Sequence, residues 1–221
     1  LIEVWRKHAD DPRAMLDAEA ASVADLILGP TAQNLVRVFL LQERLKGLAR
    51  ATDSGVRHVH VIGAGVMGGD IAAWCAYSGL TVSLQDQIPE RIAPAMGRAA
   101  KLYGRKSRDP RRVTAAWDRL IPDHRGRCVA RADLVIEAVF EDEDVKRTLY
   151  RDIESKLRSD ALLASNTSSI PLEELATALE RPERLVGLHF FNPVAKMQLV
   201  EVVRGRNSSE QSVQQAMAFT R

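Results

Sequence analysis

The chain has 221 residues, 46% hydrophobic and 27% charged, which is the composition of a globular protein and excludes a disordered or collagen-like chain. Its formal net charge of +2 is close to balance, so the charge gives no reason to expect binding to nucleic acid. No run approaches the roughly 20 apolar residues of a membrane span, and no secretory pattern starts the chain, so we expect a cytoplasmic protein without an integral membrane segment.

The first 50 residues show helical periodicity without a strand pattern. One helix is predicted over residues 14–28. A second is predicted over residues 31–50, with Thr31, directly after Pro30, as its N-cap. Its apolar side chains recur every three or four positions, at Leu35, Val38, Leu41, Leu45 and Leu48. This helix is therefore amphipathic and needs a partner surface, and the small polar residues 51–55 after it are predicted to be a linker.

From residue 56 onward, short β-branched runs alternate with helical patterns. This alternation predicts an α/β fold with a doubly wound, mostly parallel sheet of the Rossmann type. Strands are predicted at residues 59–62, 80–84, 134–139, 161–164, 185–190 and 199–203. Helices are predicted at residues 66–77, 88–103, 145–157 and 172–179. Residues 208–221 are predicted to form a further helix, which continues to the last residue. Pro94 is expected to bend the helix in which it falls or to divide it in two.

A glycine-rich turn, G-A-G-V-M-G, follows the first predicted strand and opens a helix, which is the context of a dinucleotide-binding loop. Gly63 permits the tight turn, Gly65 lets the backbone approach a pyrophosphate, and Gly68 lets the helix pack closely against the strand. The free N–H groups at the helix start, where Val66 and Met67 stand, face the anion. A glycine-rich turn without functional consequence is the alternative.

Asp86 closes the second strand of this unit, about 20 residues after the glycines, where a ribose-binding carboxylate belongs. Asp86 predicts NAD rather than NADP, because a carboxylate accepts hydrogen bonds from ribose hydroxyls and repels a 2′-phosphate. The adjacent Gln87 is also predicted to contact the cofactor. Arg91 nearby leaves the phosphorylated cofactor open, and a solvated aspartate is the structural alternative. Cys75 and Cys128 lack metal-ligand spacing, so we expect reduced thiols and no metal site.

Polar residues follow three further strands, in the segments E-A-V-F-E at 137–141, S-N-T-S-S at 165–169 and H-F-F-N-P at 189–193. Open α/β sheets bind ligands at such strand ends. Each segment alone is weak evidence for a catalytic site, because a histidine at a strand edge, for example, is more often structural than catalytic. Taken in this order, with Lys146 and the long run G-L-H-F-F-N-P-V-A-K-M-Q-L-V-E-V-V, they resemble the L-3-hydroxyacyl-CoA dehydrogenase family over residues 57–205.

The resemblance implies that His189 is a general base, which takes the proton of the substrate's 3-hydroxyl while C3 gives a hydride to the nicotinamide. It implies that Glu201, expected on the adjacent strand, holds the other ring nitrogen; a surface ion pair is the alternative for this residue. Ser168 and Asn192 match the family's substrate-side polar groups. The cofactor-contacting positions of the family correspond to Ala138, Glu141, Lys146 and Asn166. Without the resemblance, Lys146 reads as an ordinary solvated lysine.

The N-terminal run L-G-P-T-A-Q-N-L-V-R-V-F-L-L-Q-E-R-L-K resembles the connecting region of bacterial multifunctional fatty-acid oxidation α subunits. The resemblance implies that residues 1–50 are trailing helices of an upstream enoyl-CoA hydratase domain. Residues 51–221 are then an NAD-binding 3-hydroxyacyl-CoA dehydrogenase domain, truncated before a C-terminal helical domain. It also implies an acyl-CoA substrate and, for the parent protein, a thiolase β subunit as partner. We expect the isolated chain to bind NAD but to turn over slowly or not at all.

Two other interpretations are carried alongside this one. A β-hydroxyacid dehydrogenase of the hydroxyisobutyrate type also begins its dinucleotide-binding unit with G-x-G-x-M-G. Proteins of that group, however, typically bind NADP and use a lysine as the base. The second is a dinucleotide-binding assembly or sensing module without catalysis. Such a module keeps its function when His189 is replaced, whereas an enzyme loses turnover.

Overall fold

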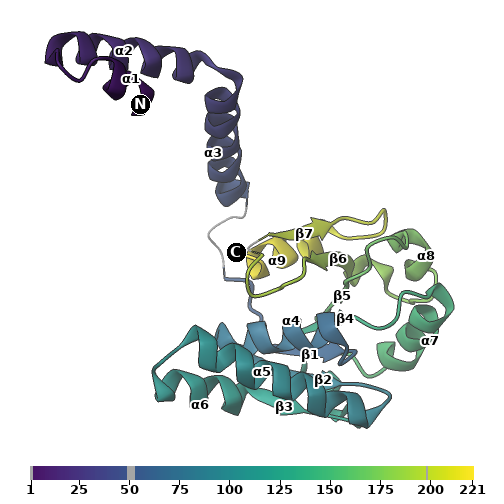
Figure 1. Ribbon diagram of the computed structural model, residues 1–221. Coiled ribbons are helices and arrows are strands. Elements are labelled where there is room, and N and C mark those ends of the chain that lie inside the picture. Colours follow the sequence, from purple (N-terminus) through teal and green to yellow (C-terminus); the bar gives the residue numbers. More distant parts are fainter. Residues whose placement is uncertain (1, 49–52, 198) are drawn as a thin grey trace. The chain divides into compact units, whose positions relative to one another are not determined.

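Figure 1 shows the computed structural model, which describes residues 2–48, 53–197 and 199–221. The chain divides into two compact units, residues 1–50 and 51–221. Part of the predicted linker, residues 51–52, lies outside the described residues. Among the described helices, none has the length and apolar character that crossing a membrane requires.

The described part of the first unit is helical and consists of α1 (Ile2–Lys7), α2 (Pro12–Leu28) and α3 (Pro30–Leu48). α2 contains the predicted helix at 14–28. It begins after Asp11, whose carboxylate accepts hydrogen bonds from the backbone N–H groups of Arg13 and Ala14. This side chain satisfies donors that have no acceptor within the helix, which explains where α2 starts.

The prediction of Thr31 as the N-cap of α3 is wrong. The helix already begins at Pro30, because the fixed φ of proline suits the first helical position, and the Gly29 carbonyl accepts the N–H of Gln33. Four of the apolar side chains predicted for one face of α3 are exposed by half or more, namely Leu35, Val38, Leu41 and Leu45. The side chain of the fifth, Leu48, lies outside the described residues.

The described part of the second unit is built on one sheet with the strand order β3-β2-β1-β4-β5-β6-β7. The strands are β1 (His58–Ile62), β2 (Thr81–Gln85), β3 (Leu120–Pro122), β4 (Leu134–Glu137), β5 (Leu162–Ser165), β6 (Leu185–Phe190) and β7 (Val200–Val203). Neighbouring strands are parallel from β3 to β6, and β7 is antiparallel to β6. The order reverses between β1 and β4, as in a doubly wound fold, so the predicted fold class is confirmed.

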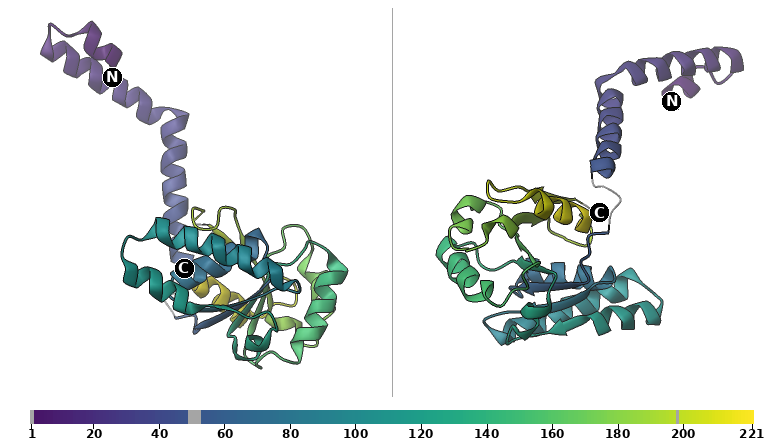
Figure 2. Two further views of the ribbon diagram at one scale, coloured as in Figure 1. Left: turned by 60° about the horizontal axis from the view of Figure 1, so that its bottom comes forward. Right: turned by 180° about the vertical axis from the view of Figure 1, so that it is seen from behind.

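Helices cover both faces of this sheet, which explains why its strands are apolar on both sides (Figures 1 and 2). One core lies between the sheet and α4 (Val66–Tyr77), α5 (Ile92–Lys106), α6 (Pro110–Arg119) and α9 (Glu210–Phe219). The other lies between the sheet and α7 (Glu143–Glu154) and α8 (Leu172–Ala176). Side chains of one strand alternate between these two cores; Val61, for example, belongs to the first and Ile62 to the second.

α5 continues through Pro94, so the proline does not divide the helix. Residues Pro89–Arg91 form a 3₁₀ turn, and α5 begins at Ile92, later than predicted. Pro94 therefore lies in the first turn of the helix, where a backbone N–H has no acceptor within the helix, so its missing N–H costs no hydrogen bond. The segment predicted as one helix at 88–103 thus consists of a 3₁₀ turn followed by α5, and the boundary between them lies before the proline.

Among the α-helices and strands of the described residues, α1, α6 and β3 were not predicted. α9 also differs from its prediction, because it ends at Phe219 instead of continuing through the last residues. The carbonyls of a final helical turn have no following N–H groups to bond, so helix ends fray at such positions.

Candidate active site

A cavity of about 620 Å³ opens at the carboxyl ends of β1, β2, β4 and β5. Its volume suits a small organic molecule. Ten of the eleven residues predicted to bind the cofactor line it: Gly63, Gly65, Val66, Met67, Asp86, Gln87, Ala138, Glu141, Lys146 and Asn166. The cavity lies where the strand order reverses, between β1 and β4, which is where open α/β sheets bind ligands.

The glycine turn has the shape that a diphosphate needs. Gly63 has a φ of +107°, and a Cβ atom there would stand 2.4 Å from the Ala138 carbonyl oxygen, so only glycine fits. Gly68, the predicted residue that does not line the cavity, packs α4 against the turn, because its Cβ would stand 1.9 Å from the Gly63 oxygen. At Gly65 a Cβ would meet nothing within 4 Å. The cavity side of this turn is therefore free for a ligand beside the first N–H groups of α4.

Asp86 is buried in the cavity wall, with 6% of its surface exposed, so the alternative of a solvated aspartate is wrong. Its Oδ2 accepts a hydrogen bond from the Ala64 N–H at 2.7 Å, and its Oδ1 accepts one from the Ile88 N–H at 2.9 Å. Each carboxylate oxygen has a second acceptor site, so both remain able to accept from a ligand hydroxyl. Arg91 lines the same cavity.

Glu141 joins the cavity wall to the loop after β5. Its Oε1 accepts hydrogen bonds from the backbone N–H groups of Ser168 at 3.0 Å and Ser169 at 3.2 Å. Partial burial raises the pKa of Glu141, but hydrogen bonds from the Thr167 hydroxyl and the Lys146 ammonium outweigh it and hold the pKa at about 2. Glu141 is therefore ionised at neutral pH and holds the S-N-T-S-S loop as a charged acceptor.

Lys146 is not an ordinary solvated lysine, because only 1% of its side chain is exposed. Its Nζ donates to Glu137 Oε1 at 2.7 Å and lies 3.1 Å from Glu141 Oε2. Glu137 also accepts hydrogen bonds from the hydroxyls of Tyr150 and Ser165. Sequence reasoning missed this buried group of side chains. The available signal was the first acidic residue of E-A-V-F-E, which ends an apolar strand and therefore needs a buried partner.

His189 and Glu201 stand opposite each other on neighbouring antiparallel strands, β6 and β7, as the sequence analysis expects. His189 Nδ1 lies 2.8 Å from Glu201 Oε2. The two side chains are 25% and 51% exposed, respectively. Because Nδ1 faces a carboxylate, Nε2 is the ring nitrogen that remains for a substrate.

His189 does not line the 620 Å³ cavity, but Ser168 connects this cavity to the side of β6 that carries His189. A smaller cavity of about 210 Å³ is lined by Ser168, Gly187 and Val203 among others. Side chains alternate along a strand, so Gly187 faces the same side of β6 as His189, two residues on. Ser168 lines both cavities. Ser168 therefore stands between the dinucleotide-sized cavity and the face of the sheet that carries His189.

Asn166 ties the end of β6 to the same loop. Its Oδ1 accepts a hydrogen bond from the Phe190 N–H at 2.9 Å. Phe190 directly follows His189, and Asn192 is exposed in the turn that comes next. Asn192 does not line the larger cavity either. This hydrogen bond adds to the pairing of β5 with β6 in linking the segment of His189 and Asn192 to the S-N-T-S-S loop.

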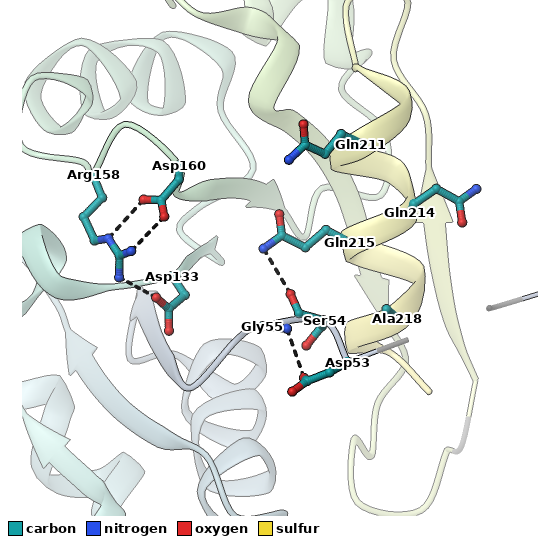
Figure 3. Close-up of a pocket in the computed structure, with 10 residues that line it drawn as sticks. All are labelled: Asp53, Ser54, Gly55, Asp133, Arg158, Asp160, Gln211, Gln214, Gln215 and Ala218. Atoms are coloured by element: carbon teal, nitrogen blue, oxygen red, sulfur yellow. Dashed lines mark hydrogen bonds and ion pairs between the residues drawn. The ribbon is translucent and has the colours of Figure 1, made fainter. Parts of the chain in front are cut away.

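A third cavity lies near the opposite, amino ends of β4 and β5, and Figure 3 shows ten residues that line it. Its volume is about 430 Å³. Its charged groups already have partners, since Arg158 binds both Asp133 and Asp160, and Asp53 pairs with Arg57. The Gln215 amide donates to the Ser54 carbonyl. None of the residues predicted for the site lines this cavity. The candidate chemistry is therefore confined to the carboxyl ends of the strands.

Comparison with known proteins agrees with this arrangement. Residues 58–221 match the family "3-hydroxyacyl-CoA dehydrogenase, NAD binding domain". The fatty acid oxidation complex subunit alpha of Psychrobacter arcticus is 40% identical over 226 residues, which covers 99% of this chain and 31% of the relative. The chain thus spans about a third of the length of such curated relatives.

Solved structures give the same result. The crystal structure of 3-hydroxybutyryl-CoA dehydrogenase from Escherichia coli is 36% identical, with a TM-score of 0.72, over 75% of this chain and 36% of that one. The (S)-3-hydroxybutyryl-CoA dehydrogenase of Ralstonia eutropha is 32% identical, with a TM-score of 0.69, over 75% of this chain and 60% of that one. The chain belongs to the 3-hydroxyacyl-CoA dehydrogenase family, and residues 58–221 form its NAD-binding domain.

Proposed function

We propose that this chain carries the dehydrogenase step of fatty-acid β-oxidation, the NAD-dependent oxidation of (S)-3-hydroxyacyl-CoA to 3-ketoacyl-CoA. The observation that supports it best is the His189–Glu201 pair, on the strand next to the loop whose Ser168 borders the dinucleotide-sized cavity. An imidazole braced by a carboxylate is suited to removing a proton from an alcohol near neutral pH.

The residues that line the 620 Å³ cavity are proposed to hold NAD, which supplies the hydride acceptor when bound. The open side of Gly65 and the N–H groups at the start of α4 take the diphosphate. Asp86 accepts from a ribose hydroxyl, since its oxygens retain acceptor sites. Glu141 and Asn166 face the other end of the cavity, beside Ser168.

The chemical step needs a proton acceptor, because a hydride leaves a carbon readily only when the hydroxyl on that carbon loses its proton. His189 Nε2 takes this proton, while Nδ1–H donates to Glu201 Oε2. The imidazolium that forms is stabilised by the carboxylate 2.8 Å away. Ser168 and Asn192 are proposed to donate hydrogen bonds to the reacting oxygen and to orient it.

We further propose the wider context of this activity. The alpha-subunit relatives are components of a fatty acid oxidation complex, and the chain spans about a third of their length. Residues 1–50 are proposed as trailing helices of an enoyl-CoA hydratase domain, with residues 51–221 as the NAD-binding domain before a C-terminal helical domain. A thiolase β subunit is the proposed partner of the whole protein, and the cytoplasm its proposed location.

Replacement of His189 tests the proposal in a protein of the relatives' full length. His189→Gln removes the base but leaves the glycine loop and Asp86 in place. We expect kcat for a 3-hydroxyacyl-CoA to fall by about 10²- to 10⁴-fold, which is the usual contribution of a general base, while the Kd of NAD stays within about twofold. NADH formation and a fluorescence titration measure the two quantities.

Two companion variants make the result interpretable. His124→Gln changes an exposed histidine that lines neither of the two cavities that Ser168 borders, and it is expected to leave kcat unchanged. Glu201→Gln keeps the hydrogen-bond acceptor but loses the charge that stabilises the imidazolium, so it is expected to lower kcat. Undiminished turnover by His189→Gln would refute the proposed base, whereas the absence of turnover in the unsubstituted full-length protein would favour a sensing module.

A further inference from the structure

Arg98 projects from α5 onto the backbone of the glycine turn. Its Nη2 donates a hydrogen bond to the Gly65 carbonyl at 2.7 Å and lies 3.5 Å from the Ala64 carbonyl oxygen. Its Nε donates to Asp70 Oδ1, on α4, at 3.1 Å. Arg98 does not line the 620 Å³ cavity. The guanidinium therefore contacts the turn that borders this cavity from a position outside the cavity lining.

Gly69, which directly follows the third glycine of the motif, makes room for this contact. A Cβ atom there would stand 2.6 Å from Arg98 Nη2 and 2.8 Å from the Ala95 Cβ. Both distances are far shorter than the ~3.5 to 4.0 Å at which carbon atoms pack. The glycine thus lets α5 lie close to α4, so that the guanidinium reaches the turn with 34% of the side chain exposed.

The Gly65 carbonyl belongs to the same peptide unit as the Val66 N–H. In a trans peptide the C=O and the N–H point in opposite directions, so a donor that fixes the carbonyl also fixes the N–H. The Gly65 carbonyl accepts from the Gly69 N–H at 3.0 Å as well, so both of its lone pairs are used. The Val66 N–H stands at the first position of α4 and has no acceptor within the helix. This N–H is available to a ligand, and the peptide that sets its direction is held by Arg98.

The charge of Arg98 also makes this N–H a stronger donor. A cation that donates to a carbonyl polarises the peptide, and hydrogen bonds that follow one another in a chain strengthen each other. At longer range the field of the cation is offset by the carboxylate of Asp70, 3.1 Å from Arg98 Nε. The effect of Arg98 is therefore concentrated on the Gly65–Val66 peptide that it contacts.

We propose that Arg98 is a positioning residue for the diphosphate of the dinucleotide. Held by Asp70, it fixes and polarises the Gly65–Val66 peptide, so that the N–H of this peptide donates to a phosphate oxygen. Asp86 holds the same turn from the end of β2, where it accepts the Ala64 N–H. The inference rests on the diphosphate site proposed above and on no part of the proton-transfer step.

Arg98→Met in the 221-residue chain tests this role. We expect the Kd of NAD to rise at least about fivefold, because the hydrogen bond to the diphosphate loses both direction and strength. Without ligand, the nitrogen-15 chemical shift of the Val66 amide is expected to change, since its own peptide carbonyl loses a charged donor. Arg98→Lys keeps the charge and one donor for this carbonyl, so it should recover much of the affinity.

Three results of these two variants overturn the proposal. The first is an NAD affinity of Arg98→Met within about twofold of the wild type, because a lost charged hydrogen bond costs more. The second is an unchanged Val66 amide shift in Arg98→Met. The third is an Arg98→Lys variant that binds NAD no better than Arg98→Met, which would indicate that the arginine only packs α5 against α4.

Asp70→Ala separates positioning from simple charge. Asp70 is an anion on the helix whose first N–H groups face an anionic ligand, so charge alone predicts that its removal strengthens NAD binding. If Asp70 instead holds Arg98 in place, its removal frees the guanidinium and weakens NAD binding, by about two- to fivefold for a partly exposed pair. Unchanged or stronger binding of NAD by Asp70→Ala refutes the positioning.

Two further variants complete the experiment. Lys101→Met is the matched control, because it removes an exposed cation of the same helix that, among the described residues, makes no hydrogen bond to the turn. It is expected to bind NAD as the wild type does. Gly65→Ala tests the diphosphate site itself, since its Cβ meets no protein atom within 4 Å and would occupy space left for the ligand.

The Gly65→Ala result separates the two proposals. We expect NAD affinity to fall by about tenfold or more, because the added methyl group clashes with the diphosphate. Wild-type affinity of Gly65→Ala would mean that the proposed diphosphate site is wrong. Weak binding by Gly65→Ala together with normal binding by Arg98→Met would mean that the site is right and that only the role of Arg98 is wrong. Titration of NAD decides each case without any turnover.

Discussion

Asp86 performs two tasks with one carboxylate. Its hydrogen bonds to Ala64 and Ile88 hold the glycine turn against the end of β2, and the same oxygens border the cavity. A charged acceptor fixed in this way cannot turn away from a 2′-phosphate, so we propose that Asp86 disfavours NADP by repulsion as well as binding NAD. In this proposal, the residue that selects the cofactor also shapes the loop.

Asp86→Ala is predicted to weaken NAD binding by about tenfold or more, because hydrogen bonds to a charged acceptor are lost. NADP binding should weaken much less, since the repulsion disappears along with the bonds. Asp86→Asn is the control, because it retains the side-chain shape and acceptors for the Ala64 or Ile88 N–H. Titration of both dinucleotides measures the effect. Equal losses for NAD and NADP would show that Asp86 serves only the fold of the turn.

His60 makes stability depend on pH. It is fully buried, with hydrogen bonds to Ser83 and Gln85. Burial lowers the pKa of His60 below its ordinary value, so the folded chain keeps the ring neutral. Below a pH of about 6.5 the unfolded chain takes up a proton that the folded chain refuses, and the free energy of unfolding falls. Above that pH the ring is neutral in both states and contributes no slope.

We therefore predict that urea unfolding between about pH 7.5 and 5.5 shows stability decreasing toward acid, by up to about 1.4 kcal/mol per pH unit for one such group. His58, whose pKa burial also lowers, adds to this slope. His60→Gln should flatten the slope, and His124→Gln at an exposed position should leave it unchanged. A slope that is the same in His60→Gln and in the wild type would contradict the assignment.

The glycines, Asp86 and the polar strand ends could be predicted because short-range sequence order alone brings them to one edge of a parallel sheet. The buried group around Glu137 could not. Its contacts join residues 9 to 28 positions apart, and they depend on which face of β4 and α7 each side chain occupies. The depth of Lys146 follows from that packing and from no local pattern, which is why a solvated lysine was a reasonable alternative.

At the scale of elements, regular periodicity decided what could be predicted. α4 and β6 have the predicted bounds, because each combines a clear apolar pattern with a recognisable start and end. β3 was missed since three residues are too few to show alternation, and its Pro122 argues against a strand except at a sheet edge, where β3 lies. α6 is short and largely polar, so its helical period is weak.

The contact between α4 and the turn before it gives a test at this scale. Gly68→Ala places a Cβ 1.9 Å from the Gly63 oxygen, so the helix must shift away from the turn. We predict a loss of about 1 to 3 kcal/mol in the free energy of unfolding, as for other overpacked sites, together with weaker NAD binding. Chemical denaturation and NAD titration measure the two effects.

Gly97→Ala is the matched control. Gly97 lies within α5, and a Cβ there would meet nothing within 4 Å. This substitution should stabilise the chain by about 0.5 to 1 kcal/mol, because alanine favours the helix. Similar effects of the two substitutions would mean that the Gly68 contact is not the reason for glycine at that position.

At the scale of the whole molecule, the two halves of the proposed site differ in how enclosed they are. The residues for NAD line one cavity of about 620 Å³. Glu201 and Asn192, by contrast, are exposed, and His189 is a quarter exposed. Solvent weakens the electrostatic interaction between a base and its carboxylate. Catalysis by such a pair is strongest where water is excluded. The residues proposed for the dinucleotide thus share one cavity, while the residues proposed for proton transfer are exposed to solvent.

From this difference we predict that the 221-residue chain binds NAD with an affinity close to that of a protein of the relatives' length but oxidises 3-hydroxyacyl-CoA far more slowly. The affinity depends on the 620 Å³ cavity, whose lining this chain supplies, and the rate depends on a base that needs a drier setting. NAD titration and NADH formation, each measured on both proteins, give the comparison. Turnover by the short chain at about 1 to 10³ per second, the ordinary range for enzymes, would show that the exposed His189–Glu201 pair suffices without further enclosure.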